Sequence, residues 1–306
     1  MCTAIKTNSY AGRNLDVEKS YGEKLITVPR HFPLTFKLQD SIDSHYAFIG
    51  IGAEEDGYPL YFDAANEKGL YVAGLNYVKN AKYHHMKSGC INLAPYELIL
   101  YLLATCSNIK EAVSELGRIN ITDIPFKEGV PLSELHFFIA DNSGSITAEP
   151  DKNGIKIYDN PVGVLTNNPS FPLHLHNLKR YAALTNEPIK NSLLPPDVFD
   201  EYSRGMGALG LPGDLSSESR FVRAAFHRLN SVSSGSASDL FHLLSSVEMP
   251  LGSLRLGDSY EYTAYSSAVD LTDVIYSYRL YESFTVRSVK LSGERLDADK
   301  PIYRDL

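Results

Sequence analysis

The chain has 306 residues, 43% of them apolar, 22% charged and 11% aromatic, a composition that excludes a disordered, collagen-like or low-complexity protein. Its formal net charge of -8 argues against nucleic acid or an anionic membrane as a general partner. It lacks an apolar run of about 18 residues that would span a bilayer. It also opens without the basic and apolar segments of a signal peptide, so we expect a cytoplasmic protein with no membrane insertion.

The predicted elements come in alternating blocks of strands and helices. Strand-like segments rich in Tyr, Val, Ile and Phe occupy residues 24–28, 46–51, 60–62 and 70–75. Apolar residues at helical spacing, with Pro95 in the first turn, predict a helical stretch over 94–116. Further strands are predicted over 135–140, 146–149, 155–158 and 162–166, helices over 173–184, 218–229 and 237–247, and final strands over 260–269, 274–281 and 284–289.

This order of blocks is not the regular alternation of a parallel βαβ protein. It predicts an α+β fold in which two sheets pack together with helices outside, a four-layer αββα sandwich. Two stretches look like linkers, Pro195-Pro196 and residues 231–238, but both are short enough to be loops. We therefore expect a single domain over 1–306, or 2–306 after removal of Met1.

Several patterns that can mark a nucleotide or metal site are better explained by ordinary loop, surface or core residues. Residues 205–210 match the letters of a glycine-rich dinucleotide motif, but no strand precedes them, and a flexible loop is favoured. The histidines at 84–85 and at 174 and 176 have no third ligand at a suitable spacing, and we interpret them as surface or rim residues. We expect neither a metal nor a cofactor. Cys106 follows an apolar run and is predicted to be a core residue.

Cys2 carries the strongest functional signal. Met1 is commonly removed before a small second residue, and removal would leave one residue with both a thiol and a free α-amine. An α-amine has a pKa of about 7.7–8.0 and a thiol about 8.5, so near neutral pH this residue can supply both base and nucleophile. The alternative is that Cys2 simply follows the initiator.

A series of motifs strengthens the catalytic interpretation. They are MCTAI (1–5), GRNLD (12–16), YGE (21–23), YPLYFDA (58–64), NEKGL (66–70), AGLN (73–76), YDNP (158–161), LTNNP (165–169), GLPGD (210–214) and SRFV (219–222). In this order, over almost the whole chain, they resemble the choloylglycine hydrolase family, which comprises the bile salt hydrolases and penicillin V acylases. These are N-terminal nucleophile hydrolases with the αββα fold.

The resemblance implies catalytic roles for several residues. Cys2 would be the nucleophile, Arg13 would favour its ionised form, Asp16 would hold the α-amine, Asn76 and Asn167 would donate to the oxyanion, and Arg220 would brace the cluster. It also implies an apolar substrate pocket lined by Leu15, Phe62, Ala65, Val130 and Leu132, for which ordinary core packing is the alternative.

The implied reaction is hydrolysis of the amide that joins a bile acid to glycine or taurine. Penicillin V or another N-acyl amide, such as an N-acyl homoserine lactone, is the alternative substrate; Asn76 favours the bile salt branch, where the penicillin branch tends to have Tyr. The segment between Cys2 and Gly12 looks shorter than in typical relatives, which motivates a third possibility, a non-catalytic binder of amphipathic acids.

Relatives in this family are commonly homotetramers assembled partly through a protruding segment. The resemblance therefore implies a homotetramer in which residues 177–204 take that part.

Overall fold

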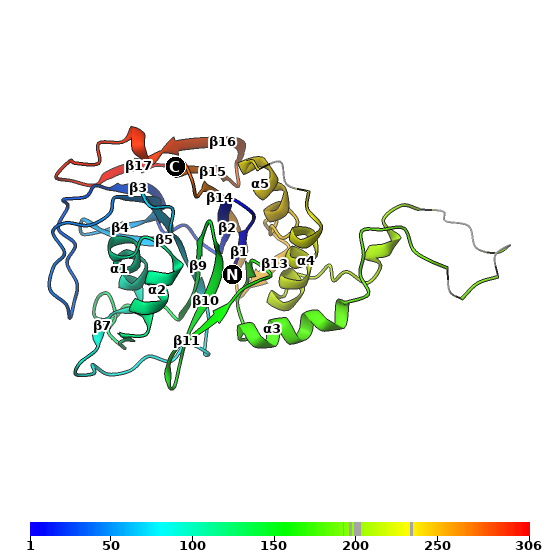
Figure 1. Cartoon of the computed structure of the whole chain (residues 1–306), viewed down its shortest axis with the longest axis horizontal. Helices are drawn as coiled ribbons and strands as arrows, with labels where there is room; N and C mark the ends of the chain where they lie inside the picture. The colour runs from blue at the N-terminus through cyan, green and yellow to red at the C-terminus, as the bar shows by residue number, and fades with distance from the viewer. Residues whose placement is uncertain (192, 196–197, 199–202, 233–234) are drawn as a thin grey trace.

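Two β-sheets pack face to face in a computed structural model that describes residues 1–191, 193–195, 198, 203–232 and 235–306. Helices cover the outer face of each sheet (Figure 1). On one side lie α1 (Leu98–Thr105) and α2 (Ile109–Leu116), and on the other lie α3 (Phe171–Leu178), α4 (Ser217–Asn230) and α5 (Ala237–Ser245). This arrangement confirms the predicted four-layer αββα sandwich. In the part of the chain that is described, no helix is long and apolar enough to cross a membrane.

The first sheet places the N-terminal strand inside the molecule. Its spatial order is β12 (Val164–Leu165), β1 (Cys2–Lys6), β2 (Tyr10–Val17), β14 (Ser259–Asp270), β15 (Ile275–Leu280) and β16 (Ser283–Lys290), with β13 (Leu254–Leu256) paired to β14. β1 and β2 form an antiparallel hairpin in which Cys2 lies opposite Leu15. β2 approaches β14 so closely that a side chain at Gly12 would collide with the backbone carbonyl of Ser267.

The second sheet is antiparallel and faces the first. Its order is β11 (Gly154–Asp159), β10 (Gly144–Asp151), β9 (Leu135–Asp141), β6 (Tyr71–Asn76), β5 (Tyr58–Asn66), β4 (Phe48–Glu55), β3 (Lys24–Val28) and β17 (Ile302–Asp305). A small parallel pair, β7 (Ile91–Leu93) and β8 (Ile119–Ile121), lies beside it.

Two apolar cores hold the layers together. One joins the facing sides of the two sheets to α4 (Ser217–Asn230), α5 (Ala237–Ser245) and the start of α3 (Phe171–Leu178). The other packs the outer side of the second sheet against α1 (Leu98–Thr105) and α2 (Ile109–Leu116), and it contains Cys106 as predicted. Cys2 belongs to the first core, so the candidate nucleophile sits between the layers.

The helix predicted over 94–116 is interrupted, which corrects the sequence-based expectation. After the 3-10 turn η1 (Pro95–Glu97), α1 ends at Thr105, and Cys106 has an extended backbone with φ of -111° and ψ of 136°. The side chain of Asn108 then caps α2 by accepting from the amide of Glu111. Meanwhile Asn66 Nδ2 donates to the carbonyls of Leu103 and Cys106, at 2.8 and 2.7 Å, and so satisfies the end of α1.

Other predicted elements differ mainly in their ends. The strand predicted over 162–166 is only the short β12, and the helix over 173–184 is α3 followed by the 3-10 turn η2 (Lys179–Tyr181). Residues 206–208 form the 3-10 turn η3 (Met206–Ala208), and η4 (Leu291–Gly293) follows β16. The linker-like stretches Pro195-Pro196 and 231–238 lie partly outside the described residues, at 196 and at 233–234.

Candidate active site

Cys2 begins β1 and lies at the wall of a cavity of about 550 Å³. Its side chain is nearly enclosed, with 3% of the residue exposed, yet it lines the cavity together with Arg13, Asp16 and Asn76. The thiol therefore has access to a ligand in this cavity while the strand that carries it is fixed in the sheet.

The backbone of Cys2 is held from both sides by polar side chains. Its amide nitrogen donates to Asn167 Oδ1 at 2.8 Å, and its carbonyl accepts from Arg220 Nη1 at 2.7 Å. Arg220 Nη2 also donates to Asn167 Oδ1 at 2.8 Å, which closes a ring of hydrogen bonds. Asn167 Nδ2 in turn donates to the carbonyl of Asn76 at 2.8 Å. The structure thus brings together four of the residues predicted from the sequence.

Arg220 comes from the first turns of α4 and has no exposed surface. Burial lowers its pKa, and the nearby Asp16 opposes that effect, with 3.9 Å between Arg220 Nη1 and Asp16 Oδ2. The guanidinium also donates to the hydroxyl of Thr3 at 2.6 Å. Arg220, for which the resemblance implied a bracing role, thus contacts the backbone of Cys2 directly.

Arg13 is likewise fully buried, on β2 beside β1. Its Nη1 donates to the carbonyls of Phe62 and Gly74, at 2.8 and 2.6 Å, on the opposite sheet. Burial alone would lower the pKa of Arg13, but neighbouring acidic groups, Cys2 foremost, outweigh it and raise the pKa above its usual value. Arg13 Nη2 has no hydrogen-bond partner among the described residues. A fixed positive charge with an unused donor therefore lies at the cavity.

Asp16 faces the end of β1 where the chain begins. Thr263 donates its hydroxyl hydrogen to Asp16 Oδ1 at 2.6 Å, at a bulge where β14 pairs with β2. The α-amine of Met1 donates to the carbonyl of Asp16 at 2.8 Å and forms an ion pair with Glu261. Asp16 Oδ2 is buried and lacks a hydrogen-bond partner in the described part of the chain. An acceptor therefore stands unused beside the chain end.

The cavity wall is mainly apolar. Leu15, Phe62, Val130 and Leu132, for which the resemblance implied a place in the pocket, are among the residues that line it. Ala65 is not among the lining residues, because its side chain is fully buried in the core between the sheets, where β5 pairs with β4 and β6. The other lining residues, which were not predicted for the pocket, include Tyr21, Tyr96, Ile99, Ile124, Pro125, Phe126 and Pro131.

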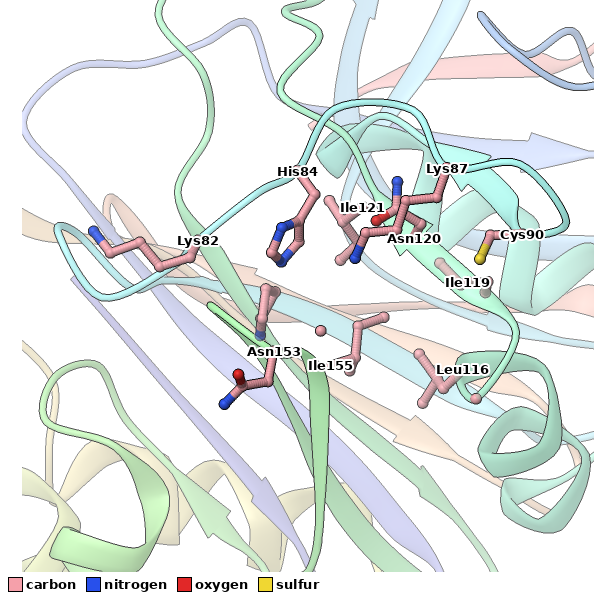
Figure 2. A pocket seen from close by; sticks show the side chains of 13 residues that line it. Lys82, His84, Lys87, Cys90, Leu116, Ile119, Asn120, Ile121, Asn153 and Ile155 are labelled. Atoms are coloured by element: carbon pink, nitrogen blue, oxygen red, sulfur yellow. The ribbon is translucent and has the colours of Figure 1, made fainter.

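A second cavity, of about 210 Å³, lies near β7, β8 and the turn between β10 and β11 (Figure 2). Several of its polar side chains already have partners within the protein. Lys82 Nζ donates to the carbonyl of Lys79 at 2.8 Å, and His84 Nε2 lies 3.0 Å from the carbonyl of Asp151. Asn120 Nδ2 donates to the side chain of a neighbouring asparagine at 2.8 Å. This cavity is therefore a weaker candidate for a reactive site than the one at Cys2.

His174 does not lie at the surface, where the sequence analysis placed the histidines. It is fully buried on α3, and its Nε2 lies 2.9 Å from the carbonyl of Asn167. Its ring stacks on Phe221 with a centroid separation of 4.6 Å. Burial lowers the pKa of His174 to about 4, so the ring is neutral near pH 7 and supports the loop that carries Asn167.

The pH dependence of stability tests this buried imidazole. Histidine has a pKa of about 6.5 in an unfolded chain. Between that value and the folded pKa of about 4, the unfolded state binds more protons, so stability falls as the pH is lowered through this window. Urea denaturation should show that the free energy of unfolding falls between pH 6.5 and 5 by about 1.5 kcal/mol more in the wild type than in His174→Gln. His176→Gln, at an exposed position of the same helix, should retain the wild-type slope; parallel curves for His174→Gln and the wild type would contradict this interpretation.

The chain matches known proteins over almost its whole length. Residues 2–304 match the family described as linear amide C-N hydrolases, choloylglycine hydrolase family. A bile salt hydrolase/transferase from Lactiplantibacillus plantarum is 49% identical, over 99% of this chain and 96% of its own length. A conjugated bile acid hydrolase from Lactobacillus gasseri is 36% identical, over 99% of each chain.

Solved structures agree with this relationship. The C2A mutant of conjugated bile acid hydrolase from Clostridium perfringens superimposes with a TM-score of 0.94 at 34% identity, covering 100% of this chain and 97% of that one. Penicillin V acylase from Agrobacterium tumefaciens shares the fold, with a TM-score of 0.78 at 19% identity, over 100% of this chain and 91% of that one. The chain belongs to the choloylglycine hydrolase family of linear amide C-N hydrolases.

Proposed function

We propose that this protein hydrolyses the amide bond of glycine- or taurine-conjugated bile salts, with Cys2 as the nucleophile after removal of Met1. Cys2 lies at the wall of a mainly apolar cavity, and Asn167 and Arg220 hold its backbone in place, which supports this reaction. The names of the relatives favour the same substrate class, since they are a bile salt hydrolase/transferase and a conjugated bile acid hydrolase.

Removal of Met1 would turn the amide nitrogen of Cys2 into an α-amine with additional hydrogens. Acceptors for them stand close by, because the carbonyl of Asp16 would lose its present donor and Asp16 Oδ2 has none among the described residues. Asn167 Oδ1 already accepts from this nitrogen at 2.8 Å. The amine would therefore be oriented by Asp16 and Asn167 without rearrangement of β1.

In the first half of the reaction, the α-amine would take the thiol proton and the thiolate would attack the amide carbonyl carbon. Arg13 favours the thiolate because its buried positive charge lies at the same cavity. The oxyanion would accept from the second hydrogen of Asn167 Nδ2 and from an amide of Asn76; each such donor typically lowers the barrier by about 3–4 kcal/mol. The carbon–nitrogen bond then breaks, and the leaving amine of glycine or taurine takes the proton from the α-ammonium.

In the second half, water would attack the thioester carbonyl while the α-amine accepts its proton. Collapse of this intermediate breaks the carbon–sulfur bond, releases the bile acid and returns the proton to sulfur. One residue therefore serves as base, nucleophile and acid in turn, and the surrounding side chains keep its two reactive atoms oriented.

The cavity suits a steroid better than a small polar acyl group. Its volume of about 550 Å³ lies within the usual range for sites that enclose a drug-sized ligand, and Leu15, Phe62 and Leu132 contribute apolar surface. Asn76 lines the cavity at the position where the penicillin branch tends to have Tyr. Penicillin V or another N-acyl amide remains the second candidate, because the chemistry at Cys2 would be the same.

Replacement of the nucleophile gives the first test. We expect wild-type protein to release glycine from glycocholate and taurine from taurocholate, with slower turnover of penicillin V. Cys2→Ala should lower the rate at least about 1000-fold, because Cys2 supplies the only thiol among the described residues that line this cavity. Released amine, measured with a fluorogenic amine reagent, reports both effects.

Cys90→Ala provides the matched control, because Cys90 is a half-buried free thiol that lines the other cavity. It should retain the wild-type rate. Binding of glycocholate without release of glycine would instead support the non-catalytic binder, and faster turnover of penicillin V than of glycocholate would transfer the assignment to the second substrate class.

The steroid pocket gives a separate test. Leu132→Ala removes apolar surface from the cavity wall, which should raise KM for glycocholate roughly five- to tenfold and leave kcat within about twofold. Leu173→Ala is the control, since Leu173 is exposed on α3 and does not line the cavity. Equal KM values for Leu132→Ala and the wild type would exclude Leu132 from substrate binding.

We also propose that the chain acts as one catalytic domain, because β1 and β17, near its two ends, both belong to the sandwich. The homotetramer is proposed with residues 177–204 as a contact segment, of which 192, 196–197 and 199–202 lie outside the described residues. The neighbouring turn η3 lies well away from the sheets (Figure 1), and Leu209 just after it is 81% exposed, as an unpaired contact surface would be. Light scattering should give about four times the 34.0 kDa chain mass, and a monomer mass would remove this proposal.

A cytoplasmic location is supported by the cysteines, since Cys2, Cys90 and Cys106 are all free thiols, which is typical of proteins kept in a reducing compartment.

A further inference from the structure

Asp63 is a buried carboxylate that the proposed chemistry does not use. It lies on β5 in the second sheet and has no exposed surface. Its oxygens accept hydrogen bonds from four hydroxyl groups, those of Tyr265 at 2.5 Å, Tyr276 at 2.8 Å, Ser267 at 2.9 Å and Tyr71 at 3.1 Å. Three of these residues belong to the first sheet, so the carboxylate of one sheet is bound by hydroxyls of the other.

The set of donors indicates the charge state of this carboxyl group. Burial raises the pKa of Asp63 above its usual value, although the charge of Arg13 and the hydrogen bonds from Tyr265, Tyr276 and Ser267 oppose this effect. An ionised carboxylate only accepts and has room for about four hydrogen bonds, whereas a protonated one would need one of the hydroxyls to accept instead. Four hydroxyl donors on two oxygens therefore fit the ionised form.

Asp63 is connected to Arg13 in two ways. The hydroxyl of Ser267 donates to Asp63 Oδ2 and accepts from the backbone amide of Arg13 at 3.2 Å. The residue before Asp63 is Phe62, whose carbonyl accepts from Arg13 Nη1. The negative charge of Asp63 also acts on Arg13 directly and helps to raise its pKa.

We propose that Asp63 is a positioning residue of the active site, which aligns Arg13 through Ser267 and balances part of the guanidinium charge that acts on Cys2. Arg13 reaches from the first sheet to carbonyls of the second, and Asp63 reaches from the second sheet to hydroxyls of the first. These reciprocal contacts fix the distance between the sheets at the nucleophile. The proposal rests on the proposed role of Cys2 as the reactive thiol.

Removal of the negative charge should leave the positive charge of Arg13 less opposed. The thiolate of Cys2 would then persist to lower pH, because it feels a larger net positive potential. The other charged and titratable groups around Cys2 stay in place in such a variant; they are the α-amine of the chain, Asp16 on β2, Tyr21 after β2, Glu261 on β14 and Arg220 on α4.

The test compares alkylation of Cys2 by iodoacetamide as a function of pH in the wild type and in Asp63→Asn. Mass spectrometry of the N-terminal peptide separates Cys2 from the other cysteines. We expect the acidic limb of the alkylation rate to move about 0.5–1 pH unit lower in Asp63→Asn. Hydrolysis of glycocholate should fall about tenfold in kcat, because Arg13 is less well aligned.

Asp141→Asn is the matched control, a buried carboxylate on β9 that accepts from the amide of Ile109 rather than from groups near Arg13. It should lose stability but keep the alkylation profile of the wild type. An unchanged alkylation profile for Asp63→Asn, with only a lower Tm, would reduce Asp63 to a structural residue and overturn the proposal.

Ser267→Ala tests the alignment of Arg13 separately from the charge of Asp63. It also provides a second test if Asp63→Asn does not fold. It removes the link between Arg13 and Asp63 and retains the carboxylate. We expect kcat to fall about threefold to tenfold while the acidic limb of alkylation stays in place, and an unchanged kcat would overturn the alignment role. The alkylation profiles need no turnover, so a wild type that is alkylated but does not hydrolyse glycocholate would contradict the proposed function and still decide the role of Asp63.

Discussion

The arrangement of the active site depends on the buried guanidinium group of Arg13. A buried charge is costly unless its hydrogen-bond donors find acceptors. Arg13 Nη1 finds them in the carbonyls of Phe62 and Gly74, at 2.8 and 2.6 Å, on the opposite sheet, while Nη2 has no partner among the described residues. Because the donor belongs to β2 and the acceptors to β5 and β6, these bonds fix the two sheets relative to one another one strand away from Cys2.

The second buried guanidinium group, that of Arg220, helps to fix the N-terminal end of the chain. Terminal residues are usually poorly ordered unless they are tied down. Here β1 pairs on both sides, with β12 and β2, and Arg220 and Asn167 bind the carbonyl and the amide of Cys2. The same contacts that prevent fraying therefore orient the two groups that the proposed chemistry needs.

Much of the fold and the site could be predicted from the sequence because both leave local signals. The strand and helix blocks indicated the αββα layers, and the motifs around Arg13, Asn167 and Arg220 named side chains that the structure does bring to Cys2. The interruption at Cys106 was missed because the apolar spacing continues across it. It depends on Asn66, which is distant in sequence and binds the carbonyls at that point.

The remaining misses have the same origin in long-range contacts. Ala65 was placed in the pocket on the family resemblance, yet pairing of β5 with β4 and β6 puts it in the core. His174 was predicted to lie at the surface, but α3 places it in the interior, against the carbonyl of Asn167. Asp63 and Glu261 lie in strands with no distinctive spacing, and only the folded chain brings them to the hydroxyls and to the chain end that they bind.

The first residue of the mature chain, Cys2, is the proposed attacking residue. Mass spectrometry of the N-terminal peptide, from protein quenched in acid during turnover of glycocholate, tests it most directly. We expect a peptide that begins at Cys2 and carries a cholyl group on that residue. A turnover-active protein that keeps Met1, or a cholyl group found on any other residue, would contradict it.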